Sequence, residues 1–244
     1  MPDFRLICGD SLDTLFTLGT DGIDHIVTDP PYASGGRQQS GARNTITKSR
    51  REDESWFGGD NMGTDTYIWF LRELGKQFIR VTRSGGHLYV FTDWRQYSNV
   101  VTAFESVGYT LKSLIVWDKN LSGAMGSFWR NNHEFIVCLT KGKALPLAHR
   151  SAYNTYRCSK PQGGLHPTEK PVELLRYICG AIPPGIILDP FAGSGSTGVA
   201  AAQTGHSFIG IDHNQEYIDL ATKRLNAAYS QPTLLTSGEP HESN

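Results

Sequence analysis

Short apolar runs alternate along the chain with longer stretches in which apolar residues recur every three or four positions. The short runs have the length and composition of buried strands, whereas the longer stretches have the period of helices that bury one face. Strands are expected at Phe4–Cys8, Asp24–Thr28, Gly86–Thr92, Lys112–Trp117, Phe135–Thr140, Gly185–Leu188 and Ser207–Ile211. Helices are expected at Thr66–Val81, Arg95–Val107, Pro171–Cys179, Thr197–Thr204 and Asn214–Ala228. This alternation is typical of βαβ units, so it predicts an α/β fold with a mostly parallel central sheet and helices on both faces.

One pair of expected strands departs from this plan. No helical pattern separates 112–117 from 135–140, so these two strands are expected to form an antiparallel edge of the sheet. Residues 33–64, and most of 120–164, lack periodicity and are rich in Gly, Ser, Asn and basic residues. We therefore expect a single domain over residues 1–230 with insertions at about 33–64 and 120–164, followed by a flexible polar tail at 231–244.

The composition is typical of a cytoplasmic protein. The chain of 244 residues has no apolar run long enough to cross a membrane, and its start, MPDFRLICGD, lacks the features of a secretory signal. The four cysteines are scattered and form no CxxC pair. We therefore expect a cytoplasmic location, no membrane partner, no metal site and no disulfide framework.

Charge is distributed unevenly along the chain. The net charge is −1, but residues 37–51 carry +5 and residues 112–160 carry +6, which leaves −12 on the remainder. Local basic segments of this kind are typical of proteins that bind polyanions, although solvated loops would give the same pattern.

A glycine-rich turn follows one of the expected strands. The segment GIILDPFAGSGSTG (185–198) leaves the strand at Asp189 and enters a helix of small residues, and the next strand ends at Asp212. Glycines at the carboxyl end of a strand allow backbone N–H groups to approach a ligand closely. An acid at the end of the following strand suits the two hydroxyls of a ribose.

Several interpretations of this turn compete. A phosphate-binding loop requires a lysine after its last glycine, and none is present. Gly193, Gly195 and Gly198 spell the dinucleotide pattern GxGxxG, as in a nicotinamide-dependent oxidoreductase, but the preceding Asp-Pro-Phe is unexpected there. The remaining alternatives are a site for S-adenosylmethionine (SAM) and a purely structural turn.

A second unusual turn lies in TDPPY (28–32), where an apolar strand runs directly into an acid, two prolines and a tyrosine. DPPY and DPFAGSGST in one chain resemble the motifs of the SAM-dependent DNA amino-methyltransferases, which modify adenine N6 or cytosine N4. The order, with DPPY first, is similar to the permuted arrangement called the β class, as are HPTEKP (166–171), CGDSLDTL (8–15) and GIDHNQEYIDLATKRL near the end. The resemblance covers nearly all of residues 4–228 and implies a Rossmann-like methyltransferase fold.

The resemblance also implies roles for individual residues. Phe191, Gly193 and Gly195 would line the SAM turn, with Asp189 near the methionine amino group and Asp212 on the ribose hydroxyls. Asp10 would contact the SAM adenine, and Asp29 would lie beside the sulfonium. The residues implied to close over the methionine moiety are His166, Thr168 and Lys170, although Lys170 could equally be a plain surface charge.

The chemistry of amine methylation explains the DPPY turn. The amino nitrogen must pyramidalise before it can attack a sulfonium methyl, and two acceptors on its hydrogens favour that geometry. The Asp29 carboxylate is one acceptor and the Pro30 carbonyl is the other, because Pro31 biases Pro30 towards an extended conformation. Tyr32 would stack on a base flipped out of the duplex, which offsets part of the cost of flipping. We expect Asp29 to accept a hydrogen bond and not to act as a general base, since an ordinary aspartate is a weak base.

The expected function is site-specific methylation of adenine N6 in double-stranded DNA. The alternatives are an N4-cytosine enzyme, an RNA methyltransferase, and a DNA-binding relative without catalysis. The residues expected to contact DNA are Arg37, Arg43, Lys48, Arg50, Arg51, Arg130, Asn131 and Asn132. Phe128 and Trp129 are either part of that surface or core residues. A homodimer and a separate restriction endonuclease remain open as partners.

Overall fold

The computed structural model describes residues 2–31, 63–120, 129–149, 151–161 and 169–230. The strands in these ranges are β1 (Phe4–Cys8), β2 (Ile23–Thr28), β3 (Thr82–Thr92), β4 (Tyr109–Asp118), β5 (His133–Lys141), β6 (Thr155–Arg157), β7 (Ile186–Asp189) and β8 (Ser207–Asp212). They form one sheet in the order β1-β8-β7-β2-β3-β5-β4-β6. All neighbouring strands are parallel except β3–β5 and β5–β4, so the predicted mostly parallel α/β sheet is confirmed.

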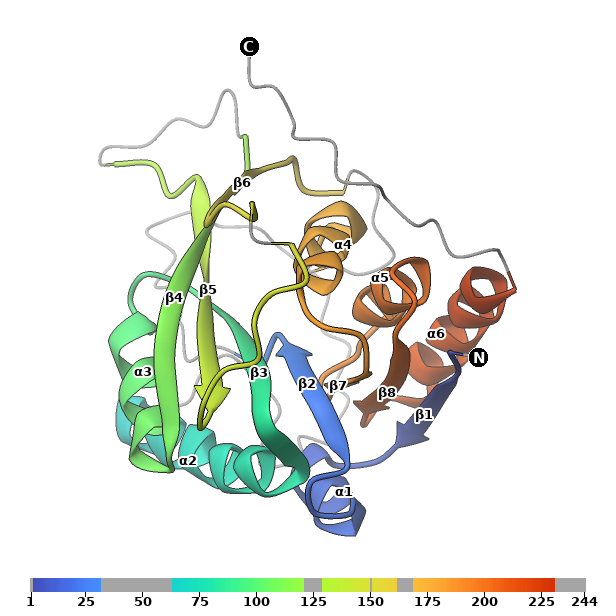
Figure 1. The fold of residues 1–244 in the computed structure, drawn as a ribbon, viewed down its shortest axis with the longest axis horizontal. Coiled ribbons are helices and arrows are strands. Elements are labelled where there is room, and N and C mark those ends of the chain that lie inside the picture. The colour runs from blue at the N-terminus through green and yellow to red at the C-terminus, as the bar shows by residue number, and fades with distance from the viewer. Residues whose placement is uncertain (1, 32–62, 121–128, 150, 162–168, 231–244) are drawn as a thin grey trace, which may run out of the picture.

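Helices cover both faces of the sheet (Figure 1). The helices are α1 (Ser11–Thr17), α2 (Thr64–Val81), α3 (Tyr97–Ser106), α4 (Val172–Ala181), α5 (Ser196–Gln203) and α6 (Gln215–Tyr229). Helices α1 to α3 contribute to one buried apolar cluster and α4 to α6 to a second, so the sheet lies between two cores. None of the helices in the described ranges is long and apolar enough to cross a membrane.

The alternation of side chains along β3 shows how the sheet serves both cores. Leu88 and Val90 point into the first cluster, whereas Tyr89 and Phe91 point into the second. Successive strand residues face opposite sides, and here both sides are covered by helices, so the strand is a continuous apolar run. This burial on both faces is the reason that the short apolar runs predict the strands so closely.

The antiparallel pairing of the two predicted strands is confirmed, but its place in the sheet differs from expectation. β5 runs antiparallel between β3 and β4, inside the sheet, and the outermost position belongs to β6, which pairs with β4 in parallel. β6 has three residues, too few for a periodic pattern, and the sequence did not predict it. The short helix α1 was not predicted either.

Several strands end on the same side of the sheet. β2, β7 and β8 are parallel neighbours, so Thr28, Asp189 and Asp212 end their strands side by side. β4 ends at the same edge and β5 begins there, because Asp118 pairs with His133. Ligand sites in open α/β sheets lie outside the carboxyl ends of the strands, and both candidate turns lie there.

Candidate active site

Asp29 directly follows β2 and is held by an ion pair. Its Oδ2 lies 2.6 Å from the Nζ of Lys170, and the two side chains are 25% and 11% exposed. Pro30 is buried and Pro31 is half-buried. Tyr32 lies outside the described residues. Because Lys170 is almost enclosed and paired, the alternative that it is a plain surface charge is wrong.

Lys170 also contacts a second carboxylate. Its Nζ lies 3.2 Å from Oε2 of Glu134, and Oε1 of Glu134 lies 2.5 Å from the Nζ of Lys119. Burial alone would lower the pKa of Lys170, but Asp29 and Glu134 outweigh burial, and the pKa is raised. Burial alone would raise the pKa of Glu134, but Lys170 and then Lys119 outweigh it, and the pKa is lowered. Lys170 and Glu134 are therefore both charged at neutral pH.

Asp189 connects the two candidate turns. Its Oδ1 accepts a hydrogen bond from Thr28, the residue before Asp29, at 2.9 Å, and its Oδ2 accepts one from Thr197 at 2.7 Å. The backbone N–H of Phe191 also donates to Oδ1 at 3.1 Å. Burial raises the pKa of Asp189 to about 6 although these donors oppose the shift. The carboxylate thus fixes the start of the glycine turn against β2.

The glycines of the turn have different surroundings. Gly193 has φ +50°, and a Cβ placed there would meet no atom within 4 Å. Gly195 has φ +83°, and a Cβ there would lie 2.9 Å from atoms of both Ala221 and Leu225. Gly195 is therefore required for packing against α6, whereas Gly193 borders open space that a ligand could occupy.

Asp212 lies beside that open space. Its Oδ2 accepts a hydrogen bond from the backbone N–H of Gly193 at 2.9 Å, and its Oδ1 accepts one from Asn214 at 2.9 Å. The half-buried ring of Phe191 contacts Phe70 of α2 edge-on, with centroids 6.2 Å apart. These residues form a cradle at the ends of β7 and β8 whose acceptor oxygens are already oriented.

The predicted residue Asp10 and its neighbour Ser11 have structural roles at this end of the sheet. Asp10 is exposed and caps helix α1, where its side chain accepts from the N–H of Asp13 at 3.1 Å. The neighbouring Ser11 hydroxyl donates to the Pro190 carbonyl, which joins the start of α1 to the glycine turn. Asp10 is thus held close to the turn by its helix.

Glu169 anchors the segment that carries Lys170. Its Oε1 accepts from Ser196 at the start of α5 at 2.8 Å and lies 2.8 Å from Nη1 of Arg224 in α6. Arg224 in turn donates to the carbonyl oxygen of Ser194. The adjacent residues 169 and 170 therefore connect the glycine turn with Asp29.

The predicted DNA contacts are only partly within the described residues. Arg130, Asn131 and Asn132 are exposed just before β5, and Trp129 is 86% exposed, so Trp129 is not a core residue. Besides Tyr32, the predicted site residues that lie outside the described ranges are Arg37, Arg43, Lys48, Arg50, Arg51, His166 and Thr168, together with Phe128.

Sequence reasoning missed Glu134, Glu169 and Lys119. Glu169 lies within HPTEKP, so its motif could have indicated it. Glu134 is an acid at the start of an apolar strand, which is an unusual position unless the carboxylate has a partner. No local signal marks Lys119.

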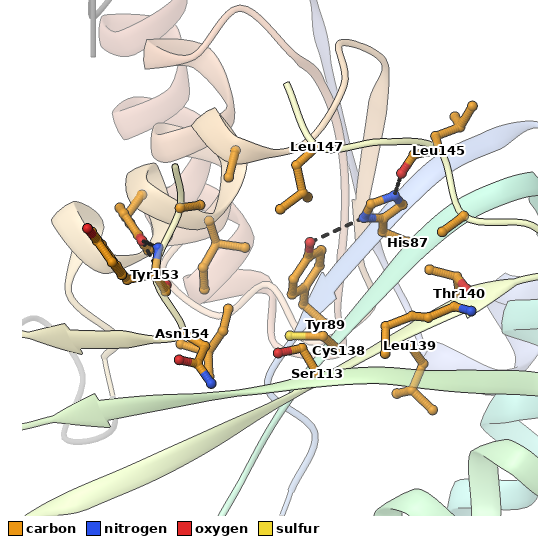
Figure 2. Close-up of a pocket in the computed structure, with 17 residues that line it drawn as sticks. His87, Tyr89, Ser113, Cys138, Leu139, Thr140, Leu145, Leu147, Tyr153 and Asn154 are labelled. Atoms are coloured by element: carbon orange, nitrogen blue, oxygen red, sulfur yellow. Dashed lines mark hydrogen bonds between the residues drawn. The ribbon is translucent and has the colours of Figure 1, made fainter. Parts of the chain in front are cut away.

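A separate cavity lies away from these residues. It has a volume of about 240 Å³ and lies between strands β3 to β5, helix α4 and residues 144–147 and 152–154. Figure 2 shows it lined largely by apolar side chains, with His87 hydrogen-bonded to the hydroxyl of Tyr89 and to the carbonyl of Leu145. Neither Asp29 nor the glycine turn borders it, so it is not part of the candidate active site.

Comparison with known proteins gives the family. The family model described as DNA methylase matches residues 23–223, which include both turns. The chain belongs to the SAM-dependent DNA amino-methyltransferases that modify adenine N6 or cytosine N4. This DNA amino-methyltransferase is 31% identical over 226 residues to the protein YubD of Escherichia coli (strain K12). The alignment covers 91% of this chain and 90% of that protein.

Solved structures of methyltransferases share the fold of this amino-methyltransferase. The M1.HpyAVI–SAM complex superposes with a TM-score of 0.69 at 24% identity, covering 91% of this chain and 99% of the other. The cytosine-N4-specific PvuII DNA methyltransferase superposes with a TM-score of 0.72 at 15% identity, covering 94% and 92% of the two chains.

Proposed function

We propose that this DNA amino-methyltransferase transfers a methyl group from SAM to N6 of an adenine flipped out of double-stranded DNA. The observation that carries the proposal is the placement of Asp29 next to the glycine turn. A hydrogen bond joins Thr28 to Asp189, so the acceptor carboxylate and the open cradle at Gly193 belong to adjoining strand ends.

The cradle suits the adenosylmethionine cofactor. Gly193 leaves room for a ligand, and the Asp212 carboxylate beside it has the acceptor chemistry that ribose hydroxyls require. Bound there, SAM supplies an electrophilic methyl group on a sulfonium. We assign Phe191, Gly193, Gly195 and Asp212 to the cradle, with Asp189 and Asp10 close to it, and His166 and Thr168 to the segment that closes over it. Lys170, at the end of that segment, is paired with Asp29.

Asp29 and Pro30 act on the amine of the base. The carboxylate of Asp29 and the carbonyl of Pro30 each accept a hydrogen from the exocyclic NH₂, which directs the nitrogen lone pair away from the ring. Positive charge grows on that nitrogen during transfer, and both acceptors stabilise it. The proton is lost after methylation, and Tyr32 holds the extruded base by stacking.

The choice of adenine rests on the Asp in DPPY, whereas SPPY is more usual for cytosine N4. The fold itself does not discriminate, because the cytosine-N4-specific PvuII enzyme has the same architecture. N4-cytosine methylation is therefore the second candidate. Exposed Arg130, Asn131 and Asn132, with the basic residues of 37–51, are proposed to contact DNA. A restriction endonuclease partner and a homodimer stay predictions.

Transfer of tritiated methyl groups from SAM to DNA, followed by digestion to nucleosides, tests the proposal. We expect N6-methyladenine; N4-methylcytosine alone would refute the choice of base. Asp29→Ala should abolish transfer, with SAM binding measured by calorimetry unchanged within about threefold, because the cradle is built from other residues. Turnover retained by Asp29→Ala would contradict the assigned role, and absence of transfer by the wild type would favour a non-catalytic DNA-binding protein.

A further inference from the structure

Lys170 lies between two carboxylates from different parts of the sheet. Its Nζ is 2.6 Å from Asp29 Oδ2, after β2, and 3.2 Å from Glu134 Oε2, at the start of β5. The same ammonium lies 5.3 Å from the ring centre of Phe91 in β3. The side chain is 11% exposed, so its orientation is fixed by these contacts and not by solvent.

Glu134 is itself held firmly. Its second oxygen, Oε1, pairs with Lys119, whose backbone N–H donates to the carbonyl of Asn132 at 2.7 Å. The Lys119 ammonium lies 5.5 Å from the ring centre of Trp117, and the indole Nε1 of Trp117 donates to the Cys158 carbonyl at 2.9 Å. The contacts form a continuous chain from β4 and β5 through Lys170 to Asp29.

We propose that Lys170, anchored by Glu134, is a positioning residue that sets the orientation of the Asp29 carboxylate for the target amine. The inference rests on the proposed function and deepens it, because it assigns a task to two residues outside the DPPY turn. An aspartate at the end of a strand can turn about two side-chain bonds. An ammonium on one of its oxygens restricts both rotations and so fixes the plane in which the amine is accepted.

Glu134 is required to hold Lys170 in place, because the Lys170 ammonium is buried between two carboxylates. Removal of one partner of a buried ion pair leaves an uncompensated charge, which either draws in water or forces the remaining side chain elsewhere. Without Glu134, Lys170 would lose one of its two anionic contacts and part of the constraint that it places on Asp29. The effect on the reaction follows from geometry, since a displacement of about 1 Å at a reacting group can slow a reaction about 100-fold.

The experiment separates this task from a role in binding the cofactor. Single-turnover methyl transfer at saturating SAM and DNA would be measured for Lys170→Met, Lys170→Arg and Glu134→Gln, with the dissociation constant for SAM measured by calorimetry. We expect Lys170→Met to slow transfer about 30- to 100-fold with SAM binding changed less than about threefold. Lys170→Arg, which keeps the charge and the donors, should recover transfer to within about tenfold of the wild type.

Coupling between the two residues provides a second readout. Glu134→Gln should slow transfer about tenfold, and the double variant Lys170→Met/Glu134→Gln should be no more than about twofold slower than Lys170→Met, because both act through Asp29. Lys76→Met is the matched control, since Lys76 is an exposed lysine in an ion pair with Glu73 on α2. Circular dichroism would confirm that each variant is folded.

Several results would overturn the inference. They are an unchanged transfer rate in Lys170→Met, a loss explained entirely by weaker SAM binding, and additive effects in the double variant. Crystal structures add a readout independent of activity: the Asp29 carboxylate should be reoriented in Lys170→Met, and an identical orientation would contradict the proposal. A wild-type protein that methylates cytosine would refute the adenine choice alone, whereas one without any transfer to DNA would overturn both proposals.

Discussion

Three buried histidines should limit the stability of this enzyme in acid. They lie at the end of the sheet that is opposite to Asp29. His25 in β2 is fully buried, and its ring lies 5.3 Å from that of His87 and 6.4 Å from that of His206. The His25 Nε2 lies 2.9 Å from the Pro183 carbonyl, and its Nδ1 accepts from the backbone N–H of His87 at 3.3 Å. These partners require a neutral ring, because a proton on Nδ1 would face another donor.

The magnitude follows from the pKa of His25. Burial, and then repulsion from His87 and His206, lowers the pKa from 6.5 to about 4. The unfolded chain therefore binds a proton at a higher pH than the folded chain. As the pH falls below 6.5 the free energy of unfolding decreases, and the decrease is complete below about pH 4. Linkage gives a loss of about 2 kcal/mol between pH 7 and pH 5 from His25 alone.

The assay is urea unfolding followed by circular dichroism at a series of pH values. His25→Asn keeps an acceptor for the N–H of His87 and removes the titrating ring, so its packing cost is independent of pH. We expect the change in unfolding free energy from pH 7 to pH 5 to be about 2 kcal/mol smaller in His25→Asn than in the wild type. His149→Asn, at an exposed position, is the control. Equal pH dependence in the wild type and His25→Asn would refute the reasoning.

Two further predictions concern the cradle and the surface. Gly193→Ala should cost about 1 kcal/mol of unfolding free energy because of its positive φ but weaken SAM binding at least about tenfold, since its Cβ would enter the open space. Gly195→Ala should cost about 2–4 kcal/mol of unfolding free energy, because the strain of its positive φ adds to the close contacts with Ala221 and Leu225. Urea unfolding measures the stability of both variants and calorimetry measures their SAM binding. Equal losses of stability in the two variants would contradict the different roles assigned to the two glycines. Arg130→Ala should weaken DNA binding and reduce the slope of log affinity against log salt by about 1; an unchanged slope in a salt titration would argue against a phosphate contact.

Local patterns in the sequence predicted most of the sheet and the two turns. Seven of the eight strands in the described residues were predicted, because a strand covered by helices on both faces is an apolar run that local composition reveals. Asp29, Asp189 and Asp212 were predicted as strand-end residues for the same reason. Their proximity was implied only by the family resemblance, since the pattern of strands does not give their order in the sheet.

The partners of these residues, in contrast, depend on the completed fold. The contacts of Lys170 with Asp29 and Glu134 join residues 141 and 36 positions apart in the chain, and no periodicity marks such a meeting. The same is true of β6 at the sheet edge and of the different surroundings of Gly193 and Gly195. A pattern of apolar and polar residues records which face of an element is buried, whereas ion pairs and close packing depend on which elements the completed fold brings into contact.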